Sequence, residues 1–293
     1  MIPDLNMHQH PTVTPFFDTQ SNTIAYVVQE PGGPACVAID AVMNFDAAAG
    51  RLTSECADAM IAHIEGAGLN LEWIIETHVH ADHLSGAPYI QDRLGGKIGI
   101  GAQITTVQET FGKVFNEGTE FQRDGSQFDA LFSDGDTYQV GAMACTALHT
   151  PGHTPACMVH IMGDAVFAGD TLFMPDGGSA RADFPGGDAG QLYDSIQRVL
   201  ALPDEMRLFV CHDYGPGGRA IAWETTIAEQ RAANIHVGEG ASREAFVTMR
   251  EARDAQLSMP KLILPALQVN MRAGDIPEDG AGNMVLKIPV NRI

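Results

Sequence analysis

The feature that most constrains this chain is a cluster of histidines, ETHVHADHLSGA at residues 76–87, directly after an apolar run. Its most polar side chains belong to His78, His80, Asp82 and His83. Leaving such groups unpaired inside a protein costs about 2–7 kcal/mol for a neutral polar group and more for a charge. Zinc or iron satisfies imidazole nitrogens and carboxylate oxygens together, so the cluster predicts a metal site.

Polar residues follow three other predicted strands in the same way. HTPGHT offers His149 and His153, VFAGDT offers Asp170, and FVCHDYGPGG offers His212. Strand ends that lead into loops are where a rigid scaffold presents chemistry. Because side chains alternate along an extended segment, the two rings of an HxH pair point to one side. Asp82 and His83 then return from the other direction, so one short segment can serve two adjacent metal positions.

The other histidines are expected not to bind metal, because each stands alone in a helix, a strand or the tail: His8, His10, His63, His160 and His236. His149 is interpreted as a strand-end residue, with orientation of a ligand as the alternative. Cys211 alternates to the opposite side of its strand from His212, which predicts a core residue rather than a nucleophile. The five cysteines are scattered and contain no CxxC pair, so we expect no disulfide framework and a cytoplasmic, reducing location.

Composition excludes several classes of partner. The 293 residues carry a formal net charge of −20, which argues against nucleic acid and against anionic membrane surfaces. An anionic substrate must therefore be held by a few local arginines or by the metal. No run of about 18 apolar residues predicts a transmembrane helix. The amino-terminal residues lack the basic and apolar pattern of a targeting signal.

The chain reads as an α/β protein whose first third alternates strands with helices. Strands are predicted at 23–30, 35–42, 71–78, 97–102 and 208–212, with strand–turn–strand patterns over 128–150 and 157–170. Helices are predicted at 54–68, 85–96, 104–115, 188–201, 222–234 and 242–256. We expect a single domain over residues 1–293. Residues 235–293 would be its C-terminal extension, packed on the core or on a partner subunit.

The motifs THVHADH, HTPGHT, FAGD and CHDY occur in this order within residues 15–215 and resemble those of the metallo-β-lactamase superfamily. The resemblance implies a four-layer αββα sandwich with metal at one edge, between two sheets. In its two-metal members it places three ligands on one metal, namely His78, His80 and His153. It places Asp82, His83 and His212 on the other metal, with Asp170 as the bridge.

Longer stretches look like one branch of that superfamily, the persulfide dioxygenases related to the ethylmalonic-encephalopathy protein. They are ETHVHADHLSGA, TPGHTPACMVH, GDTLFMPDGGSARADFPGG and LYDSIQRVLALPDEMRLFVCHDY. LPALQVNMRAGDIP is similar to the bacterial β-lactamase-hydrolase-like group, so the resemblance covers nearly the whole chain. It implies a bacterial enzyme, expected as a homodimer, that oxidises glutathione persulfide with O2 to sulfite and glutathione.

In that branch a single Fe(II) is bound, and the matching ligands are His78, His153 and Asp170. The resemblance makes the remaining four side chains orienting groups: His80, Asp82, His83 and His212. Tyr214 is the candidate for a catalytic hydroxyl near Asp170, with a packed aromatic as the alternative. Arg181 and Arg219 lie in Gly-rich loops, and either can pair with the carboxylates of glutathione, with an ordinary ion-paired arginine as the alternative.

Three other functions remain open at this stage. A glyoxalase-II-like thioesterase would share the fold and the glutathione group but would use two zinc ions and hydrolysis. A non-catalytic domain would keep the metal for structure or for persulfide sensing. A broad hydrolase of lactones or β-lactams is less compatible with the loop sequences quoted above.

Overall fold

Two strands at the centre of the first sheet are apolar on both faces because each face meets a different part of the core. They are β2 (Ile24–Gln29) and β3 (Ala35–Ile39) in the computed structural model, which describes residues 7–292. Ile24 and Val28 pack against residues of the second sheet, whereas Ala25 and Val27 pack with the helices on the outer side. Strands covered on both faces have continuous apolar sequences, which is why these two were recognisable.

Two six-stranded sheets form the inner layers of the described chain. The first has the order β1 (Thr12–Phe17), β2, β3, β6 (Asn70–Ile75), β8 (Lys97–Gly101) and β9 (Ala130–Phe132). The second has the order β10 (Thr137–Val140), β11 (Met143–His149), β12 (Met158–Met162), β13 (Ala165–Phe167), β14 (Arg207–Phe209) and β15 (Glu224–Thr226). A small third sheet has the order β5 (Arg51–Thr53), β4 (Val42–Asp46) and β7 (Leu84–Ser85).

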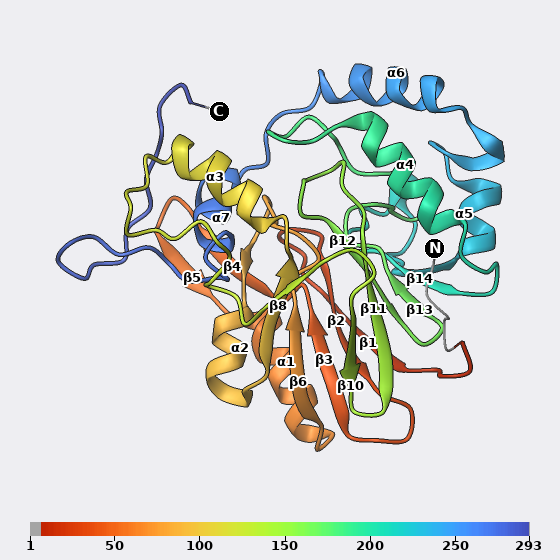
Figure 1. Cartoon of the computed structure of the whole chain (residues 1–293), viewed down its shortest axis with the longest axis horizontal. Helices are drawn as coiled ribbons and strands as arrows, with labels where there is room; N and C mark the ends of the chain where they lie inside the picture. The colour runs from red at the N-terminus through yellow and green to blue at the C-terminus, as the bar shows by residue number, and fades with distance from the viewer. Residues whose placement is uncertain (1–6, 293) are drawn as a thin grey trace.

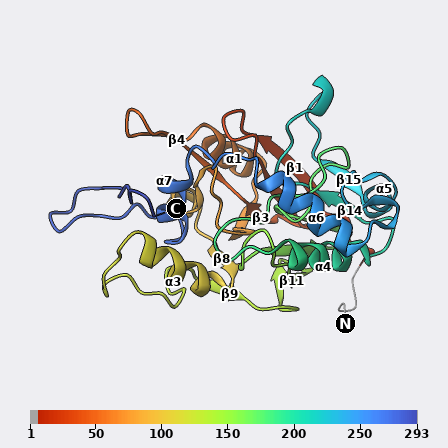
Figure 2. The same cartoon turned by 90° about the horizontal axis from the view of Figure 1, so that it is seen from above.

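Helices cover the outer faces of both sheets (Figure 1). The first sheet carries α1 (Glu55–Gly66), α2 (Ala87–Leu94) and α3 (Ile104–Val114). The second carries α4 (Ala189–Leu200), α5 (Ile227–Ala233) and α6 (Arg243–Asp254), with α6 lying along α4 in Figure 2. The result is the expected four-layer αββα sandwich. Two short 3-10 turns are η1 (Pro216–Gly218), before β15, and η2 (Gly238–Gly240), between α5 and α6.

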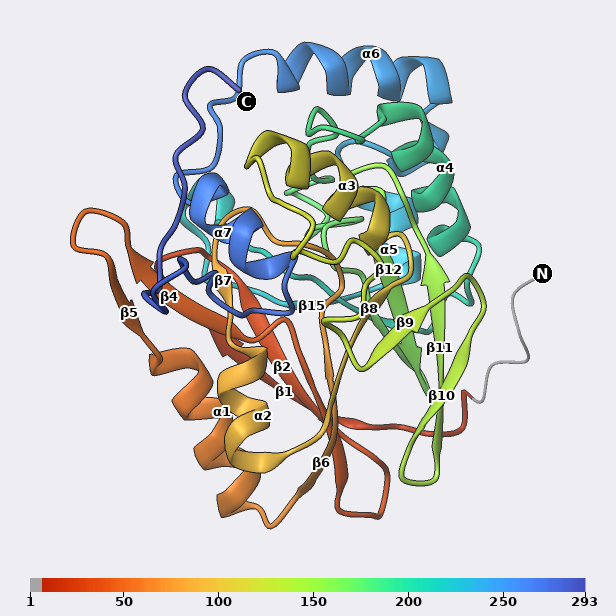
Figure 3. The same ribbon diagram turned by 60° about the vertical axis from the view of Figure 1, so that its left-hand side comes forward.

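The C-terminal region extends over both halves of the sandwich. Helix α6 runs across the top of the molecule in Figure 3, and α7 (Ile263–Asn270) then packs beside β7 at the other end. Among residues 7–292, no helix combines the length and the apolar character needed to cross a membrane.

The segment 222–234, predicted as one helix, is divided in the structure. Glu224–Thr226 form the edge strand β15, antiparallel to β14, and α5 begins only at Ile227. The Thr226 side chain accepts a hydrogen bond from the Glu229 amide, and the Glu229 carboxylate accepts one from the Thr226 amide. This capping box fixes the helix start. The two β-branched threonines before it suit a strand, which the helix prediction overlooked.

His160 on β12 is a buried titratable residue of the inner core. The ring is fully buried, and its Nδ1 lies 2.9 Å from the Tyr138 hydroxyl. Burial lowers the pKa of His160 from its ordinary 6.5 to about 4. Between these values the unfolded chain binds a proton that the folded protein does not, so protonation favours unfolding.

We therefore expect the free energy of unfolding to fall as pH drops from 6.5 towards 4, by about 2 kcal/mol between pH 7 and pH 5 from His160 alone. The measurement is urea unfolding of metal-free wild type and of His160→Asn across this range. The variant should lose that much less stability than the wild type. Parallel pH profiles for the two proteins would contradict the low pKa of His160.

Candidate metal centre

Four loops that follow strands deliver the predicted ligands to one end of the sandwich. The loop after β6 carries the His78–His83 cluster, and the turn between β11 and β12 carries His153. Asp170 follows β13 and His212 follows β14. Because β13 and β14 are parallel neighbours, their following loops emerge side by side. The sequence therefore places chemistry at four points of the chain that the two sheets bring together.

Three buried side chains form a compact donor set. The Oδ2 of Asp170 lies 3.4 Å from the Nε2 of His153 and 3.8 Å from the Nε2 of His78. The side-chain exposures are 5%, 1% and 9% for His153, His78 and Asp170. Two imidazoles and one carboxylate gathered on one side of a centre match the donor set that leaves open positions on iron.

Hydrogen bonds fix the tautomers of both histidines in this triad. Thr77 Oγ1 donates its proton to Asp40 Oδ2, so it accepts from the Nδ1–H of His78 at 3.0 Å. The Nδ1–H of His153 donates to the Arg181 carbonyl at 2.7 Å. Each Nε2 therefore keeps a lone pair that faces Asp170. Burial holds the pKa of His78 well below its usual range, so that ring is neutral as a metal ligand requires.

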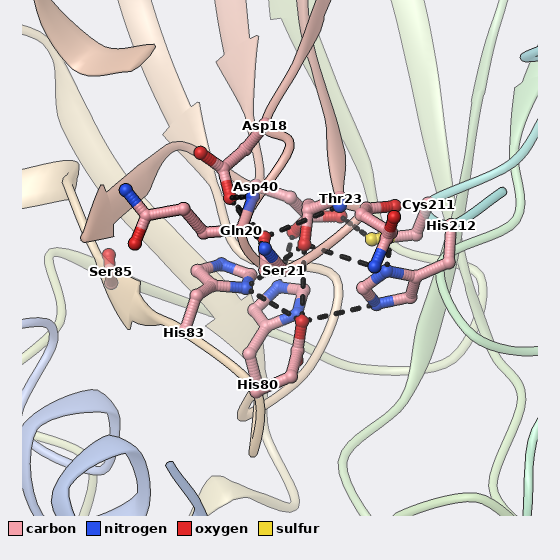
Figure 4. A network of polar contacts seen from close by, with 12 residues as sticks. Asp18, Gln20, Ser21, Thr23, Asp40, His80, His83, Ser85, Cys211 and His212 are labelled. Atoms are coloured by element: carbon pink, nitrogen blue, oxygen red, sulfur yellow. Dashed lines mark hydrogen bonds and ion pairs between the residues drawn. The ribbon is translucent and has the colours of Figure 1, made fainter. Parts of the chain in front are cut away.

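A second donor set adjoins the first across Asp170. The Nε2 of His212 lies 3.4 Å from Asp170 Oδ1 and 3.6 Å from Asp82 Oδ2. The Nδ1 of His83 lies 3.3 Å from the same Asp82 oxygen. Figure 4 shows His80, His83 and His212 gathered beneath Thr23. Burial tends to raise the pKa of Asp82, but His212 and His83 outweigh it and hold the value well below the usual range.

The Nε2 of His80 faces two other carboxylates rather than Asp170. That atom lies 3.0 Å from Asp40 Oδ1 and 3.5 Å from Glu76 Oε2. Burial tends to lower the pKa of His80, but the Asp40 carboxylate outweighs burial and raises it. The Glu76 carboxyl has its pKa raised to about 8 by burial. Because the Nε2 of His80 faces these carboxylates, its Nδ1 is the nitrogen left to bind a metal, and a metal there would displace the Nδ1 proton.

Several buried polar atoms in this region have no hydrogen-bond partner among residues 7–292. They include Asp170 Oδ1, His80 Nδ1 and His83 Nε2. Native proteins leave few such atoms unsatisfied, and each calls for an explanation. Groups of three ligand atoms within 4.8 Å of one another also form here, including His78–His153–Asp170 and His80–Asp82–His83. The donor chemistry and the unsatisfied atoms together fit a bound metal.

A cavity of about 380 Å³ opens above the donor sets. Asp82, His153, Asp170 and His212 line its inner end. Tyr214 also lines it, 60% exposed, with its ring stacked on that of His212 at 6.0 Å between centroids. The cavity therefore brings a small molecule to four of the seven predicted ligands and to the residue of the predicted catalytic hydroxyl.

Three arginines line this cavity, and they differ in whether a carboxylate already neutralises their charge. Arg181 makes two hydrogen bonds to Asp183 and also lies over the Phe184 ring. Arg250 is paired with the buried Asp254. Arg253 is exposed and has no ion-pair partner in the described part of the chain. Arg253 is therefore the cation that is free to meet an anionic ligand, and nothing in the sequence distinguished it from other helix arginines.

Arg219, predicted to bind substrate, lies elsewhere. It does not line this cavity, and its guanidinium donates to both Asp176 and Asp213. Two carboxylates occupy its donors, so its position does not support contact with a substrate. Arg219 instead ties the loop after β13 to the residue that follows His212.

Sequence reasoning also missed the residues that hold the ligands in place. Asp40 ends β3 and accepts hydrogen bonds from both the amide and the hydroxyl of Thr77. Asn270 at the end of α7 donates to the carbonyls of His80 and His83. An aspartate directly after an apolar strand was a usable signal for Asp40. Asn270 carries no such signal, because its partners lie about 190 residues away.

The chain is similar to known proteins over most of its length. The profile of the metallo-beta-lactamase superfamily matches residues 18–212. A probable metallo-hydrolase of Burkholderia pseudomallei is 51% identical over 96% of this chain and 100% of its own length. The mitochondrial persulfide dioxygenase ETHE1 of Bos taurus is 28% identical over 88% of this chain and 87% of its own. The crystal structure of ETHE1 from Myxococcus xanthus is 30% identical, with a TM-score of 0.72 over 90% of this chain and 100% of that chain.

The two donor sets should be separable by mutation. We expect His153→Gln to weaken binding of the first zinc ion at least about 100-fold, since changes to groups that only orient a ligand already cost 10–100-fold. His83→Gln, in the adjoining set, should change that first affinity only a few-fold. Competition with a chromophoric chelator measures both values. Equal losses in the two variants would mean that the two sets bind metal as one coupled unit.

Proposed function

This chain belongs to the metallo-β-lactamase superfamily, and we propose that it is a persulfide dioxygenase within it. The substrate would be glutathione persulfide, and one Fe(II) per chain would be held by His78, His153 and Asp170. The observation that carries the proposal is the two-histidine, one-carboxylate triad, two members of which, His153 and Asp170, line a cavity that arginines also line. The similarity to ETHE1 over most of both chains supports the same activity.

The overall reaction needs only groups that the proposal names. Both atoms of O2 go to the terminal sulfur of the persulfide, and water cleaves the S–S bond to release sulfite, the thiol of glutathione and two protons. Ferrous iron, when bound, supplies the redox chemistry that lets O2 react with sulfur. The chain's own residues orient the ligands, bind the thiol portion and provide a protonated hydroxyl.

Arg253 is the residue to which we assign a carboxylate of glutathione. The chain carries a net charge of −20, so an anionic substrate is repelled at long range and needs a local cation. Arg181 and Arg250 have their charge neutralised by aspartates, whereas Arg253 does not. Arg181 would contribute its stacked position against Phe184 rather than free charge.

Tyr214 is assigned as a hydrogen-bond donor to the reacting end of the substrate. Its ring lies beside His212 and lines the cavity with Asp170. Desolvation in the cavity raises the pKa of the Tyr214 hydroxyl above its ordinary value, so the hydroxyl keeps its proton at neutral pH. The proposal also places the protein in the cytoplasm, which the five unpaired cysteines support.

A second candidate function is hydrolysis of glutathione thioesters by two zinc ions. The specific observation in its favour is that the second donor set is also assembled, with Asp170 between the two sets. The Burkholderia relative carries the name of a probable metallo-hydrolase. In this alternative all seven positions act as ligands: His78, His80, Asp82, His83, His153, Asp170 and His212.

Oxygen uptake decides between the two candidates. Protein loaded with Fe(II) under anaerobic conditions should consume one O2 for each sulfite formed when glutathione persulfide and air are admitted. His78→Ala should abolish the uptake while leaving the far-UV circular dichroism unchanged. No uptake, together with cleavage of a glutathione thioester by the zinc-loaded form, would establish the hydrolase instead.

Replacing Arg253 should affect substrate binding more than turnover. We expect Arg253→Gln to raise KM for glutathione persulfide about 10-fold with kcat nearly unchanged, because one charge-assisted hydrogen bond is worth about 1.5 kcal/mol or more. Arg243→Gln is the matched control, since Arg243 lies on the same helix but pairs with Asp194 at the surface. An unchanged KM in Arg253→Gln would remove Arg253 from the binding site.

A further inference from the structure

The loop at residues 178–182 has its backbone held by side chains from the C-terminal region. Asn234 Nδ2 donates to the Gly178 carbonyl at 3.0 Å, and the Ser179 amide donates to His236 Nδ1 at 2.9 Å. The remaining contacts come from α6. Arg250 Nη1 donates to the Ser179 carbonyl at 3.1 Å, and the Ala182 amide donates to Asp254 Oδ2 at 2.9 Å.

The α6 contacts come from a buried ion pair. Arg250 and Asp254 are one helical turn apart, their side chains are 2% and 4% exposed, and the Arg250 Nη2 lies 2.6 Å from Asp254 Oδ1. Replacing a buried pair of this kind by apolar residues is often neutral for stability, so stability alone is a weak reason for its presence. Each member also bonds to the loop, which gives the pair a positional role.

Gly178 shows how closely the C-terminal region approaches the loop. Its φ is +79°, and a Cβ at this position would lie 2.2 Å from His236 Nδ1. Both the backbone conformation and the space therefore require glycine. The loop is pressed directly against His236 and has little freedom to shift.

The held loop ends in a contact with the metal centre. Arg181 lies inside it, and the Arg181 carbonyl accepts the Nδ1–H of His153 at 2.7 Å. That hydrogen bond sets which nitrogen of His153 carries the proton and how its ring is turned towards Asp170. A displacement of the loop would therefore change the position of the His153 Nε2.

We propose that residues 234–254 are a positioning segment for the metal centre, with His236, Arg250 and Asp254 as positioning residues that act on His153 through the Arg181 carbonyl. In this proposal the C-terminal extension positions a metal ligand of the same chain. The inference rests on the metal site and not on the persulfide reaction. It applies equally if the enzyme is a hydrolase.

Cobalt binding to the otherwise metal-free full-length chain tests the proposal. The main variant is the double substitution Arg250→Met with Asp254→Leu, which removes the bonds to the loop without leaving a buried unpaired charge. We expect it to fold, to bind Co(II) about 10–100-fold more weakly in chelator competition, and to change the visible spectrum of the cobalt form. In the metal-free protein, 15N NMR should show that His153 no longer holds the single Nδ1–H tautomer.

Two further variants make the result specific. The surface control Arg243→Gln, on the same helix, should bind Co(II) within about 3-fold of wild type. If the double variant fails to fold, His236→Leu decides, since it removes one acceptor and should weaken Co(II) about 10-fold. A folded double variant, or failing that a folded His236→Leu, with wild-type cobalt affinity and the wild-type His153 tautomer would overturn the proposal.

The assay contains neither persulfide nor O2. Loss of cobalt affinity in the variants alongside an absence of dioxygenase activity in the wild type would support the positioning segment while rejecting the proposed reaction. Wild-type cobalt binding in the variants alongside full oxygen uptake in the wild type would reject the positioning segment while supporting the proposed reaction.

Discussion

The candidate metal centre depends on the hydrogen bonds made by the buried carboxylate of Asp40. Its Oδ1 accepts from the Thr77 amide and faces His80 Nε2, and its Oδ2 accepts from the Thr77 hydroxyl and from Cys211 Sγ. Burial tends to raise the pKa of Asp40, but His80 and the Thr77 hydrogen bonds outweigh it and lower the value. The backbone φ of +51° at Asp40 is unusual for a residue with a side chain. One strand end thus fixes the loop after β6 and the end of β14.

The candidate ligands stood out in the sequence because their pattern is local, and the structure brings them together. His78, His80 and Asp82 lie within five consecutive residues, and each later candidate ligand follows a recognisable apolar strand. Alternation placed Cys211 in the core, and it is buried, with its pKa raised far above the usual range by burial. Alternation was wrong about its side, because the Cys211 Sγ lies within 4.8 Å of ligand atoms of His80 and His212. The four-layer fold followed from motif order and resemblance, since alternating strands and helices alone leave the topology open.

The roles of arginines and of the C-terminal region could not be found in this way, because they depend on pairing across the fold. Arg219 lies in a Gly-rich sequence typical of an anion-binding loop, yet its guanidinium donates to the carboxylates of Asp176 and Asp213. Asn270 holds one part of the ligand loop after β6, and α6 holds the loop that orients His153. Both contacts span more than 70 residues of chain, a separation over which spacing carries no signal.

The ligand atoms come from the ends of strands in both sheets, between positions 78 and 212. The proposed triad of His78, His153 and Asp170 cannot assemble until the sandwich has closed, because its three members follow different strands. Metallation is then a late event that selects among ions available to an already folded protein, unlike a zinc finger, whose ion drives folding. Metal identity in the cell would be set by supply at that moment, since nitrogen and oxygen donors alone favour zinc over ferrous iron.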